Sequence, residues 1–365
     1  MLRIQILVQI VVNTNSPIFC GLFSDFLIKL FKERNRSPEF SYLVSCVSEC
    51  IKMKKYLTAF LMAWGNFCSL PCPVKRWDSN HTSLMLGFLP LIGAVIGIVW
   101  AAAYFALVYL GFPFFAVAFL ITFLPFALCG FMHMDGFMDC CDAIMSRRPL
   151  EDRQRILKDS NTGAFAVVSM IFLVLGYFCF LSTAVTAGID FVNMILIVVL
   201  SRSVAGLHVL ICRPMSQSQY AAMQDDNESD VIDENSESKA VIEDNGESEV
   251  NAADIDTASE NVCELENESD CNCSCDAAVF SAPSEKTPKK SGIILLCVFL
   301  VIITALAFWC SSYYIATALV SVFTILGSLI AIQYAKKNLA GMSGDIAGFG
   351  IVWGELVGVF ALILC

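Results

Sequence analysis

The sequence predicts an all-α, polytopic integral membrane protein: a helical bundle of about seven transmembrane helices plus one short interfacial or re-entrant helix. Composition is the first observation, because 57% of the 365 residues are hydrophobic, only 16% are charged and the mean hydropathy is +0.68. The second is that uncharged apolar runs long enough to cross a bilayer recur along the chain. Together they exclude an ordinary soluble domain.

Acidic charge is concentrated in one segment. Residues 225–290 hold 20 of the 34 Asp and Glu residues and 4 of the 23 Lys and Arg residues, so 14 acidic and 19 basic residues remain elsewhere. With almost no aromatic residues, this segment cannot bury enough apolar surface to fold, and we predict a disordered insert. The formal net charge of -11 argues against a nucleic-acid partner.

The predicted helices divide the chain into four segments. Residues 1–52 form an N-terminal extension that we expect to be dispensable, residues 53–224 a membrane catalytic domain, residues 225–290 the acidic insert, and residues 291–365 a second membrane segment. The first apolar helix, at 56–70, stops before two prolines and is too short to span, so it is the interfacial or re-entrant helix. The seven predicted spans cover residues 84–110, 113–132, 164–187, 191–212, 292–312, 313–334 and 347–364.

Basic residues predict the orientation. Cytoplasmic loops carry an excess of Lys and Arg, and a consistent topology places these flanking residues inside: Lys54, Lys55, Lys75, Arg76, Arg147, Arg148, Lys336 and Lys337. All the polar motifs then face the cytoplasm. The 17 cysteines are scattered and show no disulfide spacing, which favours a bacterial inner membrane that borders a reducing cytosol.

The motif HMDGFMDCCD, residues 133–142, lies between two apolar segments. Asp135, Asp139 and Asp142 stand at i, i+4 and i+7, so on a helix their carboxylates share one face. Three anions this close repel one another unless a hard divalent cation such as Mg²⁺ neutralises them. The alternative is a solvated helix end with chance acids. We favour the metal site because intramembrane or membrane-edge carboxylates are costly.

Basic residues follow this motif. Guanidinium groups bind phosphates bidentately, so Arg155 and Lys158, next to Asp159 at the entrance of a span, indicate phosphoryl chemistry. Arg147 and Arg148 are better explained as determinants of topology.

Three further residues are candidates. His133 is a metal ligand, a base or a hydrogen-bonded structural histidine. Arg202, inside an apolar span, needs an anionic partner, either one of the aspartates or a substrate phosphate. Asp345 stands between Gly344 and Gly348, where the glycines allow close helix packing, and this carboxylate would complete the site from the last span.

Several motifs together resemble those of the adenosylcobinamide-GDP ribazoletransferases, also called cobalamin synthases. They are SLPCP at 69–73, FLPLIGAVIG at 88–97, GFMHMDGFMDCCDAIM at 130–145, RILKDSNTGAFAVV at 155–168, SRSV at 201–204 and GMSGDIAG at 341–348. The resemblance covers residues 53–224 and 291–365. Cys68 and Ser69 stand where the family has Thr-Arg, and neither the acidic insert nor the N-terminal extension belongs to the family pattern.

The resemblance implies a Mg²⁺-dependent membrane enzyme that joins adenosylcobinamide-GDP to α-ribazole or its 5'-phosphate and releases GMP. Other cobalamin-assembly enzymes are further candidate partners. The implied roles are a metal held by Asp135, Asp139 and Asp142, a proton acceptor in Asp159 or His133, and phosphate contacts from Arg155, Lys158 and Arg202, with Asp345 at the edge of the site.

Two other classes are less consistent with the sequence. A CDP-alcohol phosphotransferase expects DGxxAR, but Asp139 and Cys140 stand where Ala-Arg would be. A transporter predicts polar residues near the bilayer midplane in several helices and related halves, whereas the polar residues here gather at span ends and no internal repeat is visible.

Overall fold

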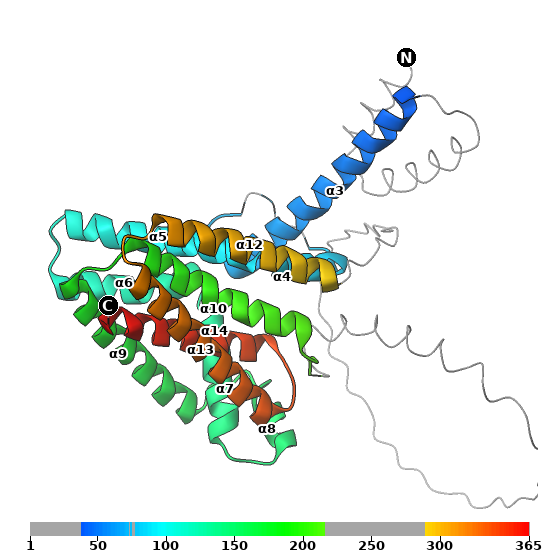
Figure 1. Cartoon of the computed structure of the whole chain (residues 1–365). Coiled ribbons are helices and arrows are strands. Elements are labelled where there is room, and N and C mark those ends of the chain that lie inside the picture. Colours follow the sequence, from blue (N-terminus) through cyan, green and yellow to red (C-terminus); the bar gives the residue numbers. More distant parts are fainter. Residues whose placement is uncertain (1–37, 73, 75–76, 216–288, 365) are drawn as a thin grey trace, which may run out of the picture. The chain divides into compact units, whose positions relative to one another are not determined.

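The computed structural model describes residues 38–72, 74, 77–215 and 289–364, with side chains from residue 53 onward. The predictions for residues 1–37 and for nearly all of the acidic insert lie outside these residues. The helices, drawn in Figure 1, are α3 (Pro38–Phe67), α4 (Thr82–Gly87), α5 (Leu89–Tyr109), α6 (Phe114–Leu128), α7 (Met132–Met145), α8 (Leu150–Ile156), α9 (Ala164–Ala187), α10 (Phe191–Ile211), α12 (Lys289–Cys310), α13 (Tyr314–Leu339) and α14 (Gly344–Ala361).

Six described helices are long and apolar enough to cross a membrane, namely α5, α9, α10, α12, α13 and α14. This confirms the predicted polytopic helical membrane fold, and the bounds of α9 agree with the predicted span at 164–187. Burial is uneven among them: 72% of the most apolar window of α10 is buried, but only 11% of that of α12. Helix α10 is therefore central, and most of α12 is left to face lipid.

The first helix is longer than predicted. We expected 56–70, but α3 spans Pro38–Phe67 and has 30 residues. Proline is tolerated in the first turn of a helix, and no further proline occurs before Pro71, so nothing in this stretch interrupts the hydrogen-bonding ladder. The helix also crosses the expected boundary at residue 52 without a break.

The second predicted span, 113–132, differs as well. Helix α6 ends at Leu128, and α7 leaves it at an angle of 89°, so the two pass as a span only as a bent pair. Gly130 and Phe131, between them, both have positive φ, at 61° and 60°. Two consecutive left-handed residues stop the α-helix and turn the chain. Consequently α7 is not one of the six spanning helices, and it carries the aspartate motif in a new direction.

The core lies where α10 and α14 meet their neighbours. Helix α10 contacts α5, α12, α13 and α14, whereas α14 contacts α7, α9, α10 and α13. Small residues allow these close crossings: a Cβ on Gly97 of α5 would lie 2.8 Å from the Cα of Ile195 in α10. Such close approach between backbones is typical of helix pairs in membranes.

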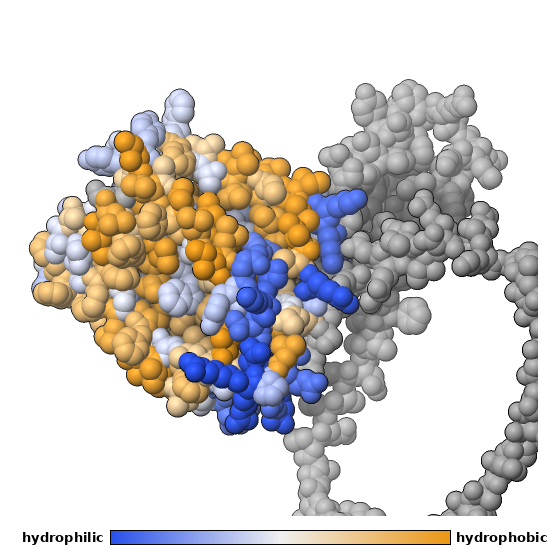
Figure 2. Space-filling model, turned by 60° about the horizontal axis from the view of Figure 1, so that its bottom comes forward, coloured by the Kyte–Doolittle hydropathy of each residue, from blue (hydrophilic) through white to orange (hydrophobic). Residues whose placement is uncertain are grey.

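Polar chain segments meet at the ends of these helices. Pro214, after α10, forms a parallel β-bridge with Met342, which precedes α14. Gln154 of α8 donates a hydrogen bond to the carbonyl oxygen of Leu339 at the end of α13. Figure 2 shows the strongly hydrophilic residues gathered along one side of the visible face, while apolar residues cover most of the rest.

Candidate active site

Helix α7 presents the carboxylates along one side and packs its other side into the bundle. Asp135 is exposed, and Asp139 and Asp142 are partly buried. The buried residues of the helix include Phe137 and Cys140, which lie between the aspartates, and Ile144, which follows them. The three aspartates therefore stand on the polar face of one amphipathic helix, as their spacing in the sequence predicts.

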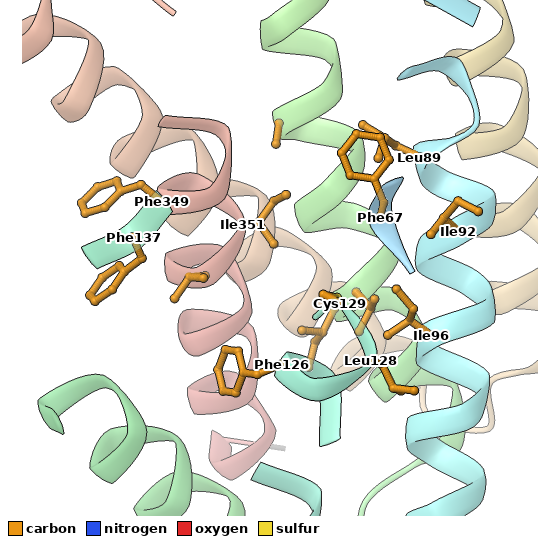
Figure 3. Packing of buried hydrophobic residues seen from close by; sticks show 14 of the residues in the cluster. Phe67, Leu89, Ile92, Ile96, Phe126, Leu128, Cys129, Phe137, Phe349 and Ile351 are labelled. Atoms are coloured by element: carbon orange, nitrogen blue, oxygen red, sulfur yellow. The ribbon is translucent and has the colours of Figure 1, made fainter. Parts of the chain in front are cut away.

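Two glycines bring α7 against the start of α14. A Cβ on Gly136 would lie 2.8 Å from the Cα and 2.9 Å from the carbonyl oxygen of Asp345, and one on Gly348 would lie 3.1 Å from the carbonyl oxygen of His133. Because neither position has a side chain, the backbones nearly touch. Beside this crossing, the rings of Phe137 and Phe349 stack with centroids 5.6 Å apart, as Figure 3 shows. The crossing places Asp345 next to the aspartate face.

Lys158 supplies a cation to this group of carboxylates. Its Nζ lies 3.0 Å from Oδ2 of Asp345, and the hydroxyl of Ser343 donates to the same oxygen. Burial, together with the carboxylates of Asp135 and Asp345, raises the pKa of Asp139 to about 7. Burial is the largest of these causes, so the raised pKa belongs to a partly desolvated carboxyl group that has two other carboxylates nearby. A cation bound beside Asp139 would favour its charged form.

Asp142 has a second role in the structure. Its carboxylate lies directly over Gly163, where any Cβ would collide with both oxygens, and Oδ1 accepts a hydrogen bond from the backbone N–H of Ala166 at 3.4 Å. Gly163 is the N-cap of α9, so a carboxylate from another helix caps this N-terminus. Asp142 therefore turns partly away from the other two aspartates.

Metal binding requires some rearrangement of these side chains. Across the residues that the structure describes, no group of three or more His, Cys, Asp or Glu side chains is placed to hold a metal ion. The donors nevertheless suit Mg²⁺ in chemistry, because they are carboxylate oxygens with an excess of negative charge. Release of Asp142 from the α9 cap would supply the third oxygen ligand that the sequence analysis expected.

Arg155 and Asp159 lie at the surface beside this group. Arg155 is 75% exposed in its side chain and pairs with Asp152 at 3.2 Å, a weak contact that a phosphate can replace. Asp159 accepts hydrogen bonds from both the backbone and the side-chain amide of Asn161. These bonds hold the pKa of Asp159 below its ordinary value, so it is a carboxylate at neutral pH.

Arg202 does not reach the aspartates. Its side chain is 1% exposed, and Nη1 forms an ion pair with Oε1 of Glu355 in α14. The other guanidinium contacts are to the carbonyl oxygen of Val198 at 3.2 Å and to Sγ of Cys129 at 2.9 Å. The expectation that its anionic partner is an aspartate of the motif or a substrate phosphate is therefore wrong, because Glu355 already fills that place.

His133 belongs to the same buried region. It is 7% exposed, and it lines a narrow space with Cys129, Arg202 and Glu355. Residues two apart on a helix point in nearly opposite directions, so His133 and Asp135 face different sides of α7. The structure thus does not bring this imidazole to the carboxylate face, which removes the support for it as a metal ligand or proton acceptor.

From the sequence, Glu355 was not predicted as the partner of Arg202, nor were the residues that bind Glu355. Glu355 also accepts hydrogen bonds from the hydroxyls of Tyr177 and Ser201, each at 3.2 Å. The sequence does show one basic and one acidic residue within apolar spans, Arg202 and Glu355. Because buried charges are paired, these two residues indicate that an ion pair inside the bundle can form. Their sequence separation of 153 residues left the pairing itself open.

Comparison with known proteins identifies relatives over most of the chain. The sequence model of the family described as cobalamin-5-phosphate synthase matches residues 59–233 and 277–363, together more than half of the chain. An adenosylcobinamide-GDP ribazoletransferase of Clostridium perfringens (strain SM101 / Type A) is 28% identical over 310 residues, which cover 85% of this chain and 99% of that relative.

Shorter matches carry the same name. A relative from Clostridium botulinum (strain Eklund 17B / Type B) is 42% identical over 121 residues, 33% of this chain and 48% of its own length. Another from Lachnoclostridium phytofermentans is 35% identical over 156 residues, 43% of this chain and 59% of its own length. No solved structure matches the chain significantly.

Proposed function

This chain belongs to the cobalamin-5-phosphate synthase family, and on that premise we propose that it transfers the cobinamide-phosphate group of adenosylcobinamide-GDP to α-ribazole or α-ribazole 5'-phosphate. The products are GMP and adenosylcobalamin or its 5'-phosphate. The relatives' name, adenosylcobinamide-GDP ribazoletransferase, supports this choice of substrates. Cobalamin synthesis by a multi-pass membrane transferase is the broader conclusion.

One observation carries the proposal beyond family membership. Segments far apart in the sequence assemble carboxylates and a lysine at the polar end of a membrane bundle: Asp135 and Asp139 from α7, Asp345 from α14 and Lys158 after α8. Clusters of this kind are used to bind a cation and phosphates for phosphoryl transfer. Both membrane segments that contribute to it fall within the residues matched by the family.

Mg²⁺ is the cofactor that these donors suit. Asp135, Asp139 and Asp142 would hold it, since it prefers carboxylate oxygens and since Asp135 and Asp345, together with burial, disfavour the charged form of Asp139 unless a cation is bound. When bound, the ion supplies positive charge that stabilises the phosphoryl oxygens and the GMP leaving group. Lys158 would hold Asp345 in place through their ion pair.

The chain's other polar residues have roles in the transfer. The 3'-hydroxyl oxygen of the ribazole bonds to the cobinamide-linked phosphorus, the bond from that phosphorus to the GMP oxygen breaks, and the hydroxyl proton passes to a carboxylate. Asp159 is an exposed carboxylate that is open to this proton, whereas His133 is buried away from the carboxylates. Arg155 and Lys158 are accessible for phosphates, whereas Arg202 acts indirectly, by holding Glu355.

We also infer the orientation and the location. The polar ends that form the site are flanked by Lys and Arg, which favours a cytoplasmic site in a bacterial cell membrane. Because the polar site lies at the end of an apolar helical bundle, it suits a large substrate that is presented at the bilayer surface.

The decisive experiment supplies purified protein in detergent with adenosylcobinamide-GDP, α-ribazole or α-ribazole 5'-phosphate, and Mg²⁺. We expect a cobalamin product and GMP in equal amounts. The Clostridium perfringens relative, assayed in parallel, controls for substrate quality. If that relative turns over and this protein forms neither product with either ribazole, the proposal is wrong.

A further inference from the structure

A separate cavity of about 480 Å³ lies between the end of α10, helix α8 and the turn from α13 to α14. Its lining includes the side chains of Gln154, Cys212, Arg213 and Lys336, together with Gly341. The volume falls in the range of small-molecule sites. Apart from Gly341, none of these residues belongs to the sequence motifs, and the reaction described above does not use this cavity.

The cavity is cationic. Arg213 and Lys336 both line it, and among the described residues no carboxylate does. Within the described part of the chain, neither residue has an ion-pair partner, and Nζ of Lys336 contacts only Sγ of Cys212, at 3.0 Å. A sulfur is a weak acceptor. Two uncompensated cations in one cavity favour an anionic ligand.

Backbone contacts fix the walls of this cavity. The N–H of Met342 donates to the carbonyl oxygen of Arg213, and the N–H of Met215 donates to that of Met342, each at 3.0 Å. Gln154 Nε2 donates to the carbonyl oxygen of Leu339 at 2.8 Å. These three bonds tie together segments from α8, the end of α10 and the α13–α14 turn, so Arg213 is held beside the end of α13 from which Lys336 projects.

The cavity adjoins the carboxylate site. Gln154 lies in α8, and Lys158, four residues further on and two residues past the end of α8, pairs with Asp345. Gly341, which lines the cavity, precedes Asp345 by four residues. A substrate that reacts beside Asp139 can therefore extend a second group into the cavity.

We propose that this cavity binds the phosphate of a nucleoside monophosphate group, with Arg213 and Lys336 as its charged contacts. The inference rests on the proposed function, in which two groups of this chemistry reach the site: the GMP half of the activated corrinoid and the 5'-phosphate of α-ribazole 5'-phosphate. Arg binds such a group bidentately, and Lys adds a point charge. If the bound group is the 5'-phosphate of α-ribazole 5'-phosphate, this cationic subsite would favour α-ribazole 5'-phosphate over α-ribazole.

The test uses full-length protein in detergent, with Arg213→Gln and Lys336→Gln as variants. Lys337→Gln is the matched control, because Lys337 carries the same charge on the same helix, is exposed and does not line the cavity. Binding of GMP and of α-ribazole 5'-phosphate is measured by calorimetry. A hydrogen bond to a charged group contributes about 1.5–3 kcal/mol, so each cavity variant should weaken binding of one of these probes roughly 10-fold or more.

Steady-state kinetics identify the source of the phosphate. A KM increase for α-ribazole 5'-phosphate but not for α-ribazole assigns the cavity to the ribazole phosphate, and an increase only for adenosylcobinamide-GDP assigns it to the GMP half. Equal thermal midpoints for the variants and the wild type show that folding is intact. If both cavity variants match Lys337→Gln in the binding of both probes, the inference is overturned. If the wild type binds a probe and the cavity variants lose that binding, but the wild type makes no cobalamin, the cavity assignment is kept and the proposed function is rejected.

Discussion

The crossing of α7 and α14 at Gly136 gives the sharpest test of how the site is assembled. Gly136→Ala would place a Cβ 2.8 Å from the Cα of Asp345, whereas ordinary contacts begin at 3.4 Å, so the helices must separate by about 0.6 Å. Overpacking of this kind costs about 1–3 kcal/mol. Alanine recovers about 0.5–1 kcal/mol through its higher helix propensity. We expect a net loss of roughly 0.5–2 kcal/mol in the free energy of unfolding.

The rate of GMP release should fall by a larger factor than the small loss in the free energy of unfolding would explain. The displaced backbone is that of Asp345, which contacts Lys158 and contributes to the charge at Asp139. A misplacement of about 1 Å in a catalytic arrangement can cost on the order of 100-fold in rate. The assay compares GMP release under saturating substrates with the thermal midpoint of the same detergent-solubilised preparation.

Gly176→Ala is the matched control. Gly176 lies within α9, and a Cβ there would be 3.5 Å from Cδ1 of Leu356, an ordinary van der Waals contact. The control should keep its activity and gain a little stability. If Gly136→Ala is as active as Gly176→Ala, the close contact between α7 and α14 does not position the site, and our reasoning about this crossing is refuted.

Three further predictions follow from the charged groups. Glu355→Ala leaves the guanidinium of Arg202 buried without its anion and should cost about 3–5 kcal/mol in the free energy of unfolding, measured as a lower thermal midpoint. The double variant Arg202→Met, Glu355→Leu should be clearly more stable than Glu355→Ala. An equal or greater loss in the double variant would contradict the pairing. Asp139→Asn should stabilise the protein in EDTA, and more at pH 8 than at pH 5, while it abolishes turnover: a folded-state pKa of about 7, above the usual 3.8, means that the wild type loses stability as pH rises between those values. After allowance for solvent screening at this partly exposed group, we expect about 1–2 kcal/mol, and a pH-independent difference in melting temperature would count against it. Asp135→Asn, or EDTA with the wild type, should lower GMP release at least 100-fold with the protein still folded, and near-normal turnover in either case would remove the metal role.

Much of this architecture was predictable because it depends on local sequence. Apolar runs set the positions of the spans, and α9 ends at Ala187, just before Gly188 and three residues before Asp190 ends the uncharged run. The helical period alone placed Asp135, Asp139 and Asp142 on one face of α7. The longer α3 and the 89° bend after α6 were missed because the first has no local breaker and the second depends on two left-handed residues.

The sequence by itself therefore determined the membrane fold and the residue types of the site, whereas only the tertiary structure decided which of those residues meet. Helix content and the amphipathic face of α7 follow from interactions within a few residues. The Arg202–Glu355 pair, the placement of Asp345 over Gly136 and the cap that Asp142 makes on α9 join residues far apart in the chain. Such contacts depend on which helix faces pack together, and a buried charge can be satisfied by any anion that the packing brings within reach. In the folded bundle Arg202 pairs with Glu355, whereas Asp135 and Asp139 lie near Asp345 on the polar side of α7.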